Sequence, residues 1–175
     1  MNKRTRQYLG LFSAVLAYYC VHEGAHLLYA LGIGVFRRIR FLGLGVQIDV
    51  YAERMTDVQM GIFCLLGVAA TSLAAWALTA AAGRLAKHPS KARKACLYYV
   101  TAAMLLIDPL YLSLLCGFVG GGDMNGIALL VPPFPARLLF GAQLVAHAGL
   151  FLKVVLPTYK QSFERVNCQT KCNSE

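Results

Sequence analysis

The amino-acid sequence predicts an all-α polytopic membrane protein with about four transmembrane helices and a short β-hairpin-like loop after the first. Hydrophobic residues make up 58% of the 175 residues and charged residues only 14%, well below the quarter that is usual in a soluble domain. Several apolar stretches of roughly 20 residues are each long enough to cross the hydrocarbon core of a bilayer. A segment with a two-residue period follows the first of them.

The apolar stretches account for most of the chain and define one domain. The predicted spans cover about residues 7–33, 61–83, 96–118 and 136–156. We therefore expect residues 1–158 to form a single transmembrane domain and residues 159–175 to form a polar C-terminal tail.

The net charge of +9 lies mainly in the segments that connect the spans. Cationic side chains cluster before the first span, between the second and third spans, and in the tail: Lys3, Arg4, Arg6, Arg84, Lys87, Lys91, Arg93, Lys94, Lys160, Arg165 and Lys171. With four spans these segments share one side, which the positive-inside rule makes cytoplasmic. The charge thus predicts a multi-pass integral membrane protein with both termini in the cytoplasm, and it does not indicate nucleic-acid binding.

The first predicted span carries the motif His22-Glu23-Gly24-Ala25-His26. Ionisable residues inside a membrane are costly and usually mark function, and this spacing is that of the zinc motif H-E-x-x-H. On a helix the two histidines lie one turn apart on one face, so both imidazoles can reach the same metal ion. Glu23 falls beside that face, where it can take a proton from a zinc-activated water.

Residues 36–53 have the alternating pattern of a β-hairpin. Apolar residues recur at every second position on both sides of Gly43-Leu44-Gly45, which predicts two strands joined by a turn. The free edge of such a strand pair can hold an extended peptide by strand addition, which makes this hairpin a candidate substrate-binding element. The alternative is a connector at the membrane surface whose edge is simply covered.

The spans at 61–83 and 96–118 differ in composition. The former is rich in Ala, Gly, Ser and Thr, which favours close helix packing. The latter contains Asp108-Pro109, and proline bends or interrupts a helix. Asp108 is a candidate metal ligand, a hydrogen-bonding partner near the site, or a neutral carboxyl that satisfies the broken backbone.

A glycine-rich stretch, Gly120-Gly121-Gly122-Asp123-Met124-Asn125-Gly126, follows. We expect non-helical backbone here that lets the chain approach a site closely. Asp123 would present a carboxylate and Asn125 an amide donor to a reaction intermediate. The alternative is a solvated turn, since these residue types favour turns.

The predicted span at 136–156 contains His147. A single histidine within a membrane usually forms a helix–helix hydrogen bond, and here it is also a candidate for supporting the site.

A catalytic zinc ion needs three protein ligands and an open position for water. His22 and His26 supply two nitrogen ligands, and the third is sought among Asp108, Asp123 and His147. Asp123 has the most favourable surroundings, because its glycine-rich stretch offers little side-chain obstruction. We therefore expect one Zn²⁺, bound by His22, His26 and one of these three side chains, among which Asp123 is favoured.

The sequence resembles the site-2-protease class of intramembrane zinc metalloproteases, especially its short bacterial members. The resemblance rests on His22-Glu23-Gly24-Ala25-His26, on the strand-like stretch Gly32 to Asp49, and on Gly121-Gly122-Asp123-Met124-Asn125-Gly126. It implies that Asp123 is the third zinc ligand, that Glu23 is the catalytic base, and that the hairpin positions substrate. It also implies a bacterial cell membrane as the location. The family's Leu-Asp-Gly motif is not reproduced, because Gly122 precedes Asp123 and Met124 follows it.

The leading hypothesis is therefore an intramembrane zinc metalloprotease that hydrolyses peptide bonds of a membrane-anchored or membrane-associated substrate. One alternative is a non-proteolytic membrane protein that binds or transports metal. Another is a zinc hydrolase of a non-peptide substrate, because H-E-x-x-H specifies the activated water and not the group that it attacks.

Overall fold

A computed structural model describes residues 2–43, 45–120 and 122–172. Leu44 of the predicted turn, Gly121 of the glycine-rich stretch and the last three residues of the predicted tail lie outside the described residues.

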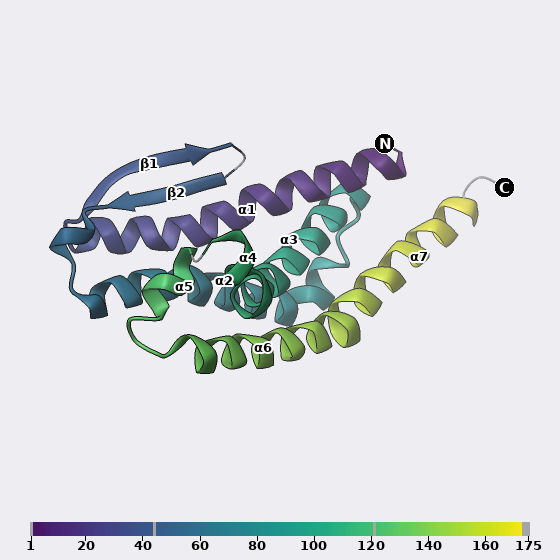
Figure 1. The fold of residues 1–175 in the computed structure, drawn as a ribbon. Helices are drawn as coiled ribbons and strands as arrows, with labels where there is room; N and C mark the ends of the chain where they lie inside the picture. The colour runs from purple at the N-terminus through teal and green to yellow at the C-terminus, as the bar shows by residue number, and fades with distance from the viewer. Residues whose placement is uncertain (1, 44, 121, 173–175) are drawn as a thin grey trace.

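The structure is mostly helical and carries one small sheet (Figure 1). The elements in order are α1 (Lys3–Gly32), β1 (Phe36–Leu42), β2 (Gly45–Val50), η1 (Ala52–Arg54), α2 (Asp57–Leu85), α3 (Lys91–Leu110), η2 (Tyr111–Leu115), α4 (Cys116–Val119), α5 (Gly122–Ile127), α6 (Pro133–Leu150), η3 (Phe151–Val155) and α7 (Leu156–Cys172). The predicted hairpin is confirmed, because β1 and β2 pair antiparallel with Ile39 opposite Ile48 and Phe41 opposite Val46.

Three helical segments among the described residues are long and apolar enough to cross a membrane. They are Asp57–Leu85, Lys91–Val119 and Pro133–Glu164, and they correspond to the second, third and fourth predicted spans. Helix α1, which contains the first predicted span, is not among them. Its tyrosines and its His-Glu-His motif make it less apolar than these three segments.

The sequence defines where the long helices begin. Thr56 and Gln59 form a capping box at the start of α2, in which each side chain bonds the other residue's backbone N–H. The Ser90 hydroxyl accepts a hydrogen bond from the backbone N–H of Arg93 at the start of α3. These caps satisfy amide groups that have no partner within the helix.

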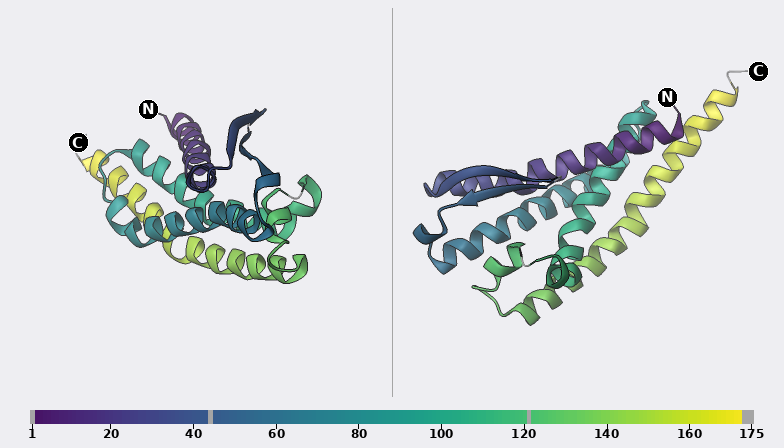
Figure 2. Two further views of the ribbon diagram at one scale, coloured as in Figure 1. Left: turned by 90° about the vertical axis from the view of Figure 1, so that its left-hand side faces the viewer. Right: turned by 45° about the horizontal axis from the view of Figure 1, so that its top comes forward.

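Helix α1 packs against α2 and α3, and the hairpin lies along α1 on the side away from α3 (Figures 1 and 2). One apolar cluster joins the end of α1, the hairpin, the first half of α2 and α5. A second cluster joins α2, α3, η3 and α7. The first two turns of α1, the first half of α3 and the first half of α7 meet at the end of the molecule away from the hairpin (Figure 2).

Pro109 does not end its helix. The chain continues from α3 into the π-helical segment η2, although proline has no N–H to donate to the carbonyl one turn back. A similar π-helical segment, η3, joins α6 to α7, so the predicted polar tail is helical as far as Cys172.

The glycine-rich stretch departs from the prediction of non-helical backbone. Gly120 and Gly122 have φ values of 96° and 41°, in the left-handed region that favours glycine, and the short helix α5 begins at Gly122. The Tyr111 hydroxyl donates a hydrogen bond of 2.6 Å to the Gly120 carbonyl oxygen. Asp123 lies in the first turn of α5, where a carboxylate is favoured.

Candidate metal centre

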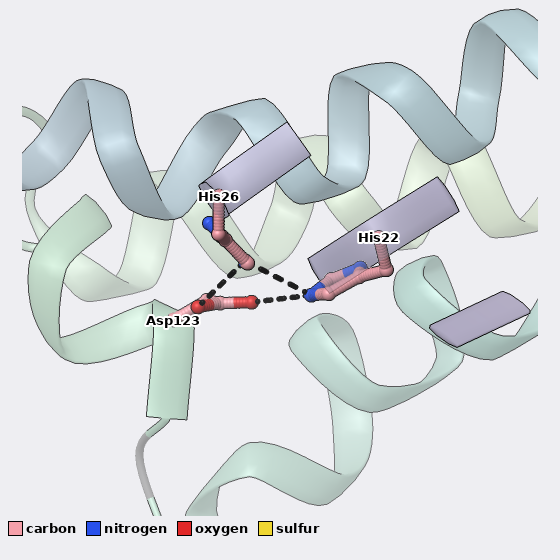
Figure 3. Close-up of side chains that lie close together, drawn as sticks. All are labelled: His22, His26 and Asp123. Atoms are coloured by element: carbon pink, nitrogen blue, oxygen red, sulfur yellow. Dashed lines mark hydrogen bonds and ion pairs between the residues drawn. The ribbon is translucent and has the colours of Figure 1, made fainter. Parts of the chain in front are cut away.

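Three side chains that the sequence places far apart converge between α1 and α5 (Figure 3). The Nε2 atoms of His22 and His26 lie 3.2 Å apart. The Asp123 carboxylate places Oδ2 3.0 Å from Nε2 of His22 and Oδ1 3.6 Å from Nε2 of His26. Both histidines are buried, whereas the side chain of Asp123 is 22% exposed, so the cluster has one side open to small molecules.

The donor set fits a zinc ion. Ligand atoms at the usual distances from a tetrahedral zinc ion lie roughly 3.3 Å from one another, and the three separations here bracket that value. Two imidazoles and one carboxylate are a ligand combination of catalytic zinc sites. No other set of three or more His, Cys, Asp or Glu side chains in the described part of the chain converges in this way.

The second nitrogen of each imidazole has its own partner, which orients the ring. Nδ1 of His26 lies 2.8 Å from the Phe63 carbonyl oxygen. Nδ1 of His22 lies 3.3 Å from the Asp108 carboxylate. A carbonyl or carboxylate at Nδ1 keeps the proton there and leaves Nε2 with its lone pair free for a metal.

Asp108 on α3 is bonded by side chains of two other helices, α1 and α2. Besides His22 on α1, it accepts hydrogen bonds from the Tyr18 hydroxyl on α1 and the Thr71 hydroxyl on α2. Asp108 and Thr71 are almost fully buried. The sequence left open whether Asp108 binds the metal directly. The structure favours a carboxylate that bonds Nδ1 of His22, the ring nitrogen that faces away from the other two candidate ligands.

Replacing Asp108 with Asn tests this supporting role. Zinc should remain bound, but its affinity should fall roughly 10–100-fold, because partners of ligand histidines have effects of this size. Zinc titration against a competing chelator measures the change. Asp57→Asn, at an exposed position in the first turn of α2, is the matched control. An affinity equal to that of the wild type would show that Asp108 does not orient His22.

Gly67 on α2 is the residue that lets the histidines approach that helix. A Cβ atom added there would lie 2.6 Å from Nε2 of His26 and 2.7 Å from Nε2 of His22. The small-residue composition of this span indicated close packing, but only the folded structure identifies Gly67 as the contact.

Gly67→Ala should therefore displace both imidazoles. We expect a fall in zinc affinity of roughly tenfold or more, since the donor atoms must move by tenths of an ångström from their shared site. The control is Gly83→Ala on the same helix, where an added Cβ meets nothing within 4 Å. Equal zinc affinity in the two variants would contradict the close packing of α2 against the histidines.

Glu23 is half-buried and connects α1 to the hairpin. Its Oε2 atom accepts a hydrogen bond of 3.2 Å from the backbone N–H of Ile48 on β2. This contact holds the carboxylate beside the histidine face and uses an amide on the β2 edge that does not pair with β1.

A cavity of about 610 Å³ opens beside Asp123. It is lined by residues 47–50 of β2, by the first two turns of α2, by α5 and by Leu129, which follows α5. Asn125 is exposed and lines this cavity next to Asp123. The free side of β2 and the candidate metal centre therefore border one cavity.

Two arginines of β1 hold the position of Asp49 in the neighbouring strand. Arg38 and Arg40 lie 3.0 Å and 2.9 Å from its carboxylate. The hydrogen bond from Arg38, helped by the charge of Arg40, holds the pKa of Asp49 below its usual range. The carboxylate therefore stays charged at neutral pH and ties the two strands together.

His147 lies away from this centre. Its Nε2 atom accepts a hydrogen bond of 3.0 Å from the Trp76 indole, and its Nδ1 atom lies 2.8 Å from the Leu105 carbonyl oxygen. These contacts are those of a histidine that joins helices, which was one of the two interpretations from the sequence.

Comparison with protein-family models, with curated proteins and with solved structures gives no match for this chain.

Proposed function

We propose that this protein is an intramembrane zinc metalloprotease of the site-2-protease type. The observation that carries the proposal is the convergence of His22, His26 and Asp123 on one point, with Glu23 of the same H-E-x-x-H motif beside them. The donor set also disfavours a metal transporter, because the described residues offer one such cluster and not a succession of them across the helices.

We further propose that α1 is a fourth membrane crossing. It has 30 residues, or about 45 Å of helix, which exceeds the hydrocarbon thickness of a bilayer. Apolar side chains face outward along its first half, with Leu11, Phe12 and Leu16 each at least half exposed. The two histidines of its motif face α2 and Asp123, so protein shields these ionisable side chains from lipid.

Each residue of the candidate metal centre has a defined role in the proposed reaction. His22, His26 and Asp123 would hold Zn²⁺, which when bound acidifies water and polarises a carbonyl group. Glu23 accepts a proton from the attacking water and returns it to the leaving amine. The Ile48 amide keeps the Glu23 carboxylate in place, and Asp108 keeps His22 in the tautomer that binds metal.

The proposed substrate is an extended peptide from a membrane-anchored or membrane-associated protein. The edge of β2 that does not pair with β1 forms one wall of the cavity beside Asp123. Its Ile48 amide bonds Glu23, and the other outward-facing backbone groups of such an edge can bind extended peptide through hydrogen bonds. A substrate strand laid along β2 would bring a peptide bond next to the candidate metal centre.

Metal removal tests the proposal. The purified protein should contain one zinc per chain and cleave single-span reporter proteins in lipid vesicles. A chelator should abolish cleavage, and added Zn²⁺ should restore it, because zinc supplies the acidified water. Elemental analysis and product mass spectrometry measure the two quantities. Cleavage that continues in metal-free protein would refute the proposal.

A further inference from the structure

A second pocket lies at the other end of the molecule, between the first two turns of α1, the first half of α3 and the first half of α7. It has a volume of about 460 Å³. The side chains that line it are Lys3, Arg6, Gln7, Lys91, Ala95, Tyr98, Tyr99, Lys160, Phe163 and Glu164. Four of these are cationic and one is anionic, so the pocket carries a net positive charge.

A further cation lies behind this lining. Lys94 is almost fully buried, and its ammonium donates hydrogen bonds to the backbone carbonyl and the hydroxyl of Ser162 at 3.1 Å and 2.8 Å. It also lies 5.1 Å from the ring centre of Phe163, which lines the pocket. Among the described residues, no carboxylate lies within ion-pair distance of Lys94. This buried charge adds to the positive potential of the pocket.

The composition changes from cationic to apolar within two turns of α1. Lys3 and Arg6 line the pocket, and the next turns expose Tyr8, Leu11 and Phe12 to the surroundings. On the facing helices, Tyr98, Tyr99 and Phe163 supply an aromatic wall. Cations beside aromatic rings that adjoin an apolar surface are typical of the boundary between lipid headgroups and acyl chains.

We propose that this pocket binds an anionic phospholipid, with the phosphate among Lys3, Arg6, Lys91 and Lys160 and the acyl chains along the exposed apolar surface of α1. A soluble phosphate compound would match the cations but would leave that apolar surface unused. The site is distinct from the candidate metal centre, because Arg6 and His22 are separated by 16 positions of one helix, or roughly 24 Å. Lipid binding at this pocket requires that the protein is inserted in a membrane, but it does not depend on the proposed proteolytic activity.

Native mass spectrometry of the full-length protein in detergent tests the proposal. The probes are phosphatidylglycerol and phosphatidylcholine with the same acyl chains, and the wild-type protein should retain phosphatidylglycerol preferentially. Removing two cations with Arg6→Gln and Lys160→Gln should lower the phosphatidylglycerol-to-phosphatidylcholine ratio roughly tenfold, as expected for cations close to an anionic headgroup.

The matched control is the double variant Arg84→Gln and Lys87→Gln. Both side chains are exposed on the same side of the protein but outside this pocket, and their loss should leave the ratio unchanged. An equal fall in both double variants would overturn the proposal, because it would indicate general charge attraction. Displacement of the lipid by glycerol 3-phosphate would overturn it in favour of a soluble ligand. If the first double variant is unstable in thermal unfolding, Lys160→Gln alone, at an exposed position, provides the same comparison.

Discussion

Glu23→Gln should abolish proteolysis and leave the zinc content unchanged. The amide keeps the size of the side chain but has no basic oxygen to accept a proton, and a positioned general base contributes roughly 10²–10⁴-fold to a rate. Glu23 is not one of the three converging donors, so its replacement should not remove metal. Cleavage of single-span reporters in vesicles and elemental analysis of the same preparation measure the two properties.

Asp57→Asn is the control for this experiment, since it makes the same carboxylate-to-amide change at an exposed position outside the cavity. It should retain full activity. Unchanged cleavage by Glu23→Gln would refute the role of Glu23 as base. Zinc flux into vesicles that persists in Glu23→Gln, without any cleavage in the wild type, would favour the alternative of a metal transporter.

Much of the arrangement around this motif could be predicted from sequence because it depends on local spacing. The i, i+4 separation of His22 and His26 places both rings on one helix face whatever surrounds them. The two-residue period of 36–53 likewise specifies a hairpin independently of its neighbours. Asp123 was selected by the chemistry of the missing ligand, and the structure brings it to the histidines; that these residues bind zinc stays a prediction.

The remaining features could not be predicted, since they arise from contacts between helices. Gly67 and Thr71 belong to a helix rich in small residues, and nothing in its sequence specifies which of them faces His22. The role of Asp108 depends on how α3 packs against α1. In another orientation of α3, its side chain would be a metal ligand or a neutral carboxyl. The helical form of α5 was missed, because several glycines in a row favour a loop, whereas in the structure a short helix begins at Gly122.

Asp123→Ala should have the largest effect on metal binding. It removes one of three donor atoms and leaves two imidazoles without the anionic ligand that offsets the charge of Zn²⁺. The loss of affinity should exceed the roughly 10–100-fold expected for Asp108→Asn, which removes a partner of a ligand and not a ligand itself. The purified variant should therefore contain little zinc, as measured by elemental analysis after dialysis.

The order of the variants distinguishes the two carboxylates. If Asp123 is the third ligand, zinc affinity should decrease from wild type and Asp57→Asn through Asp108→Asn to Asp123→Ala. Asp123→Glu should lie between the last two, because it keeps the carboxylate but moves it by one methylene group. Asp123 reaches both histidines, whereas Asp108 reaches only the far nitrogen of His22. Full retention of zinc in Asp123→Ala, together with its loss in Asp108→Asn, would reverse these assignments and require α3 to turn Asp108 toward Nε2 of His22.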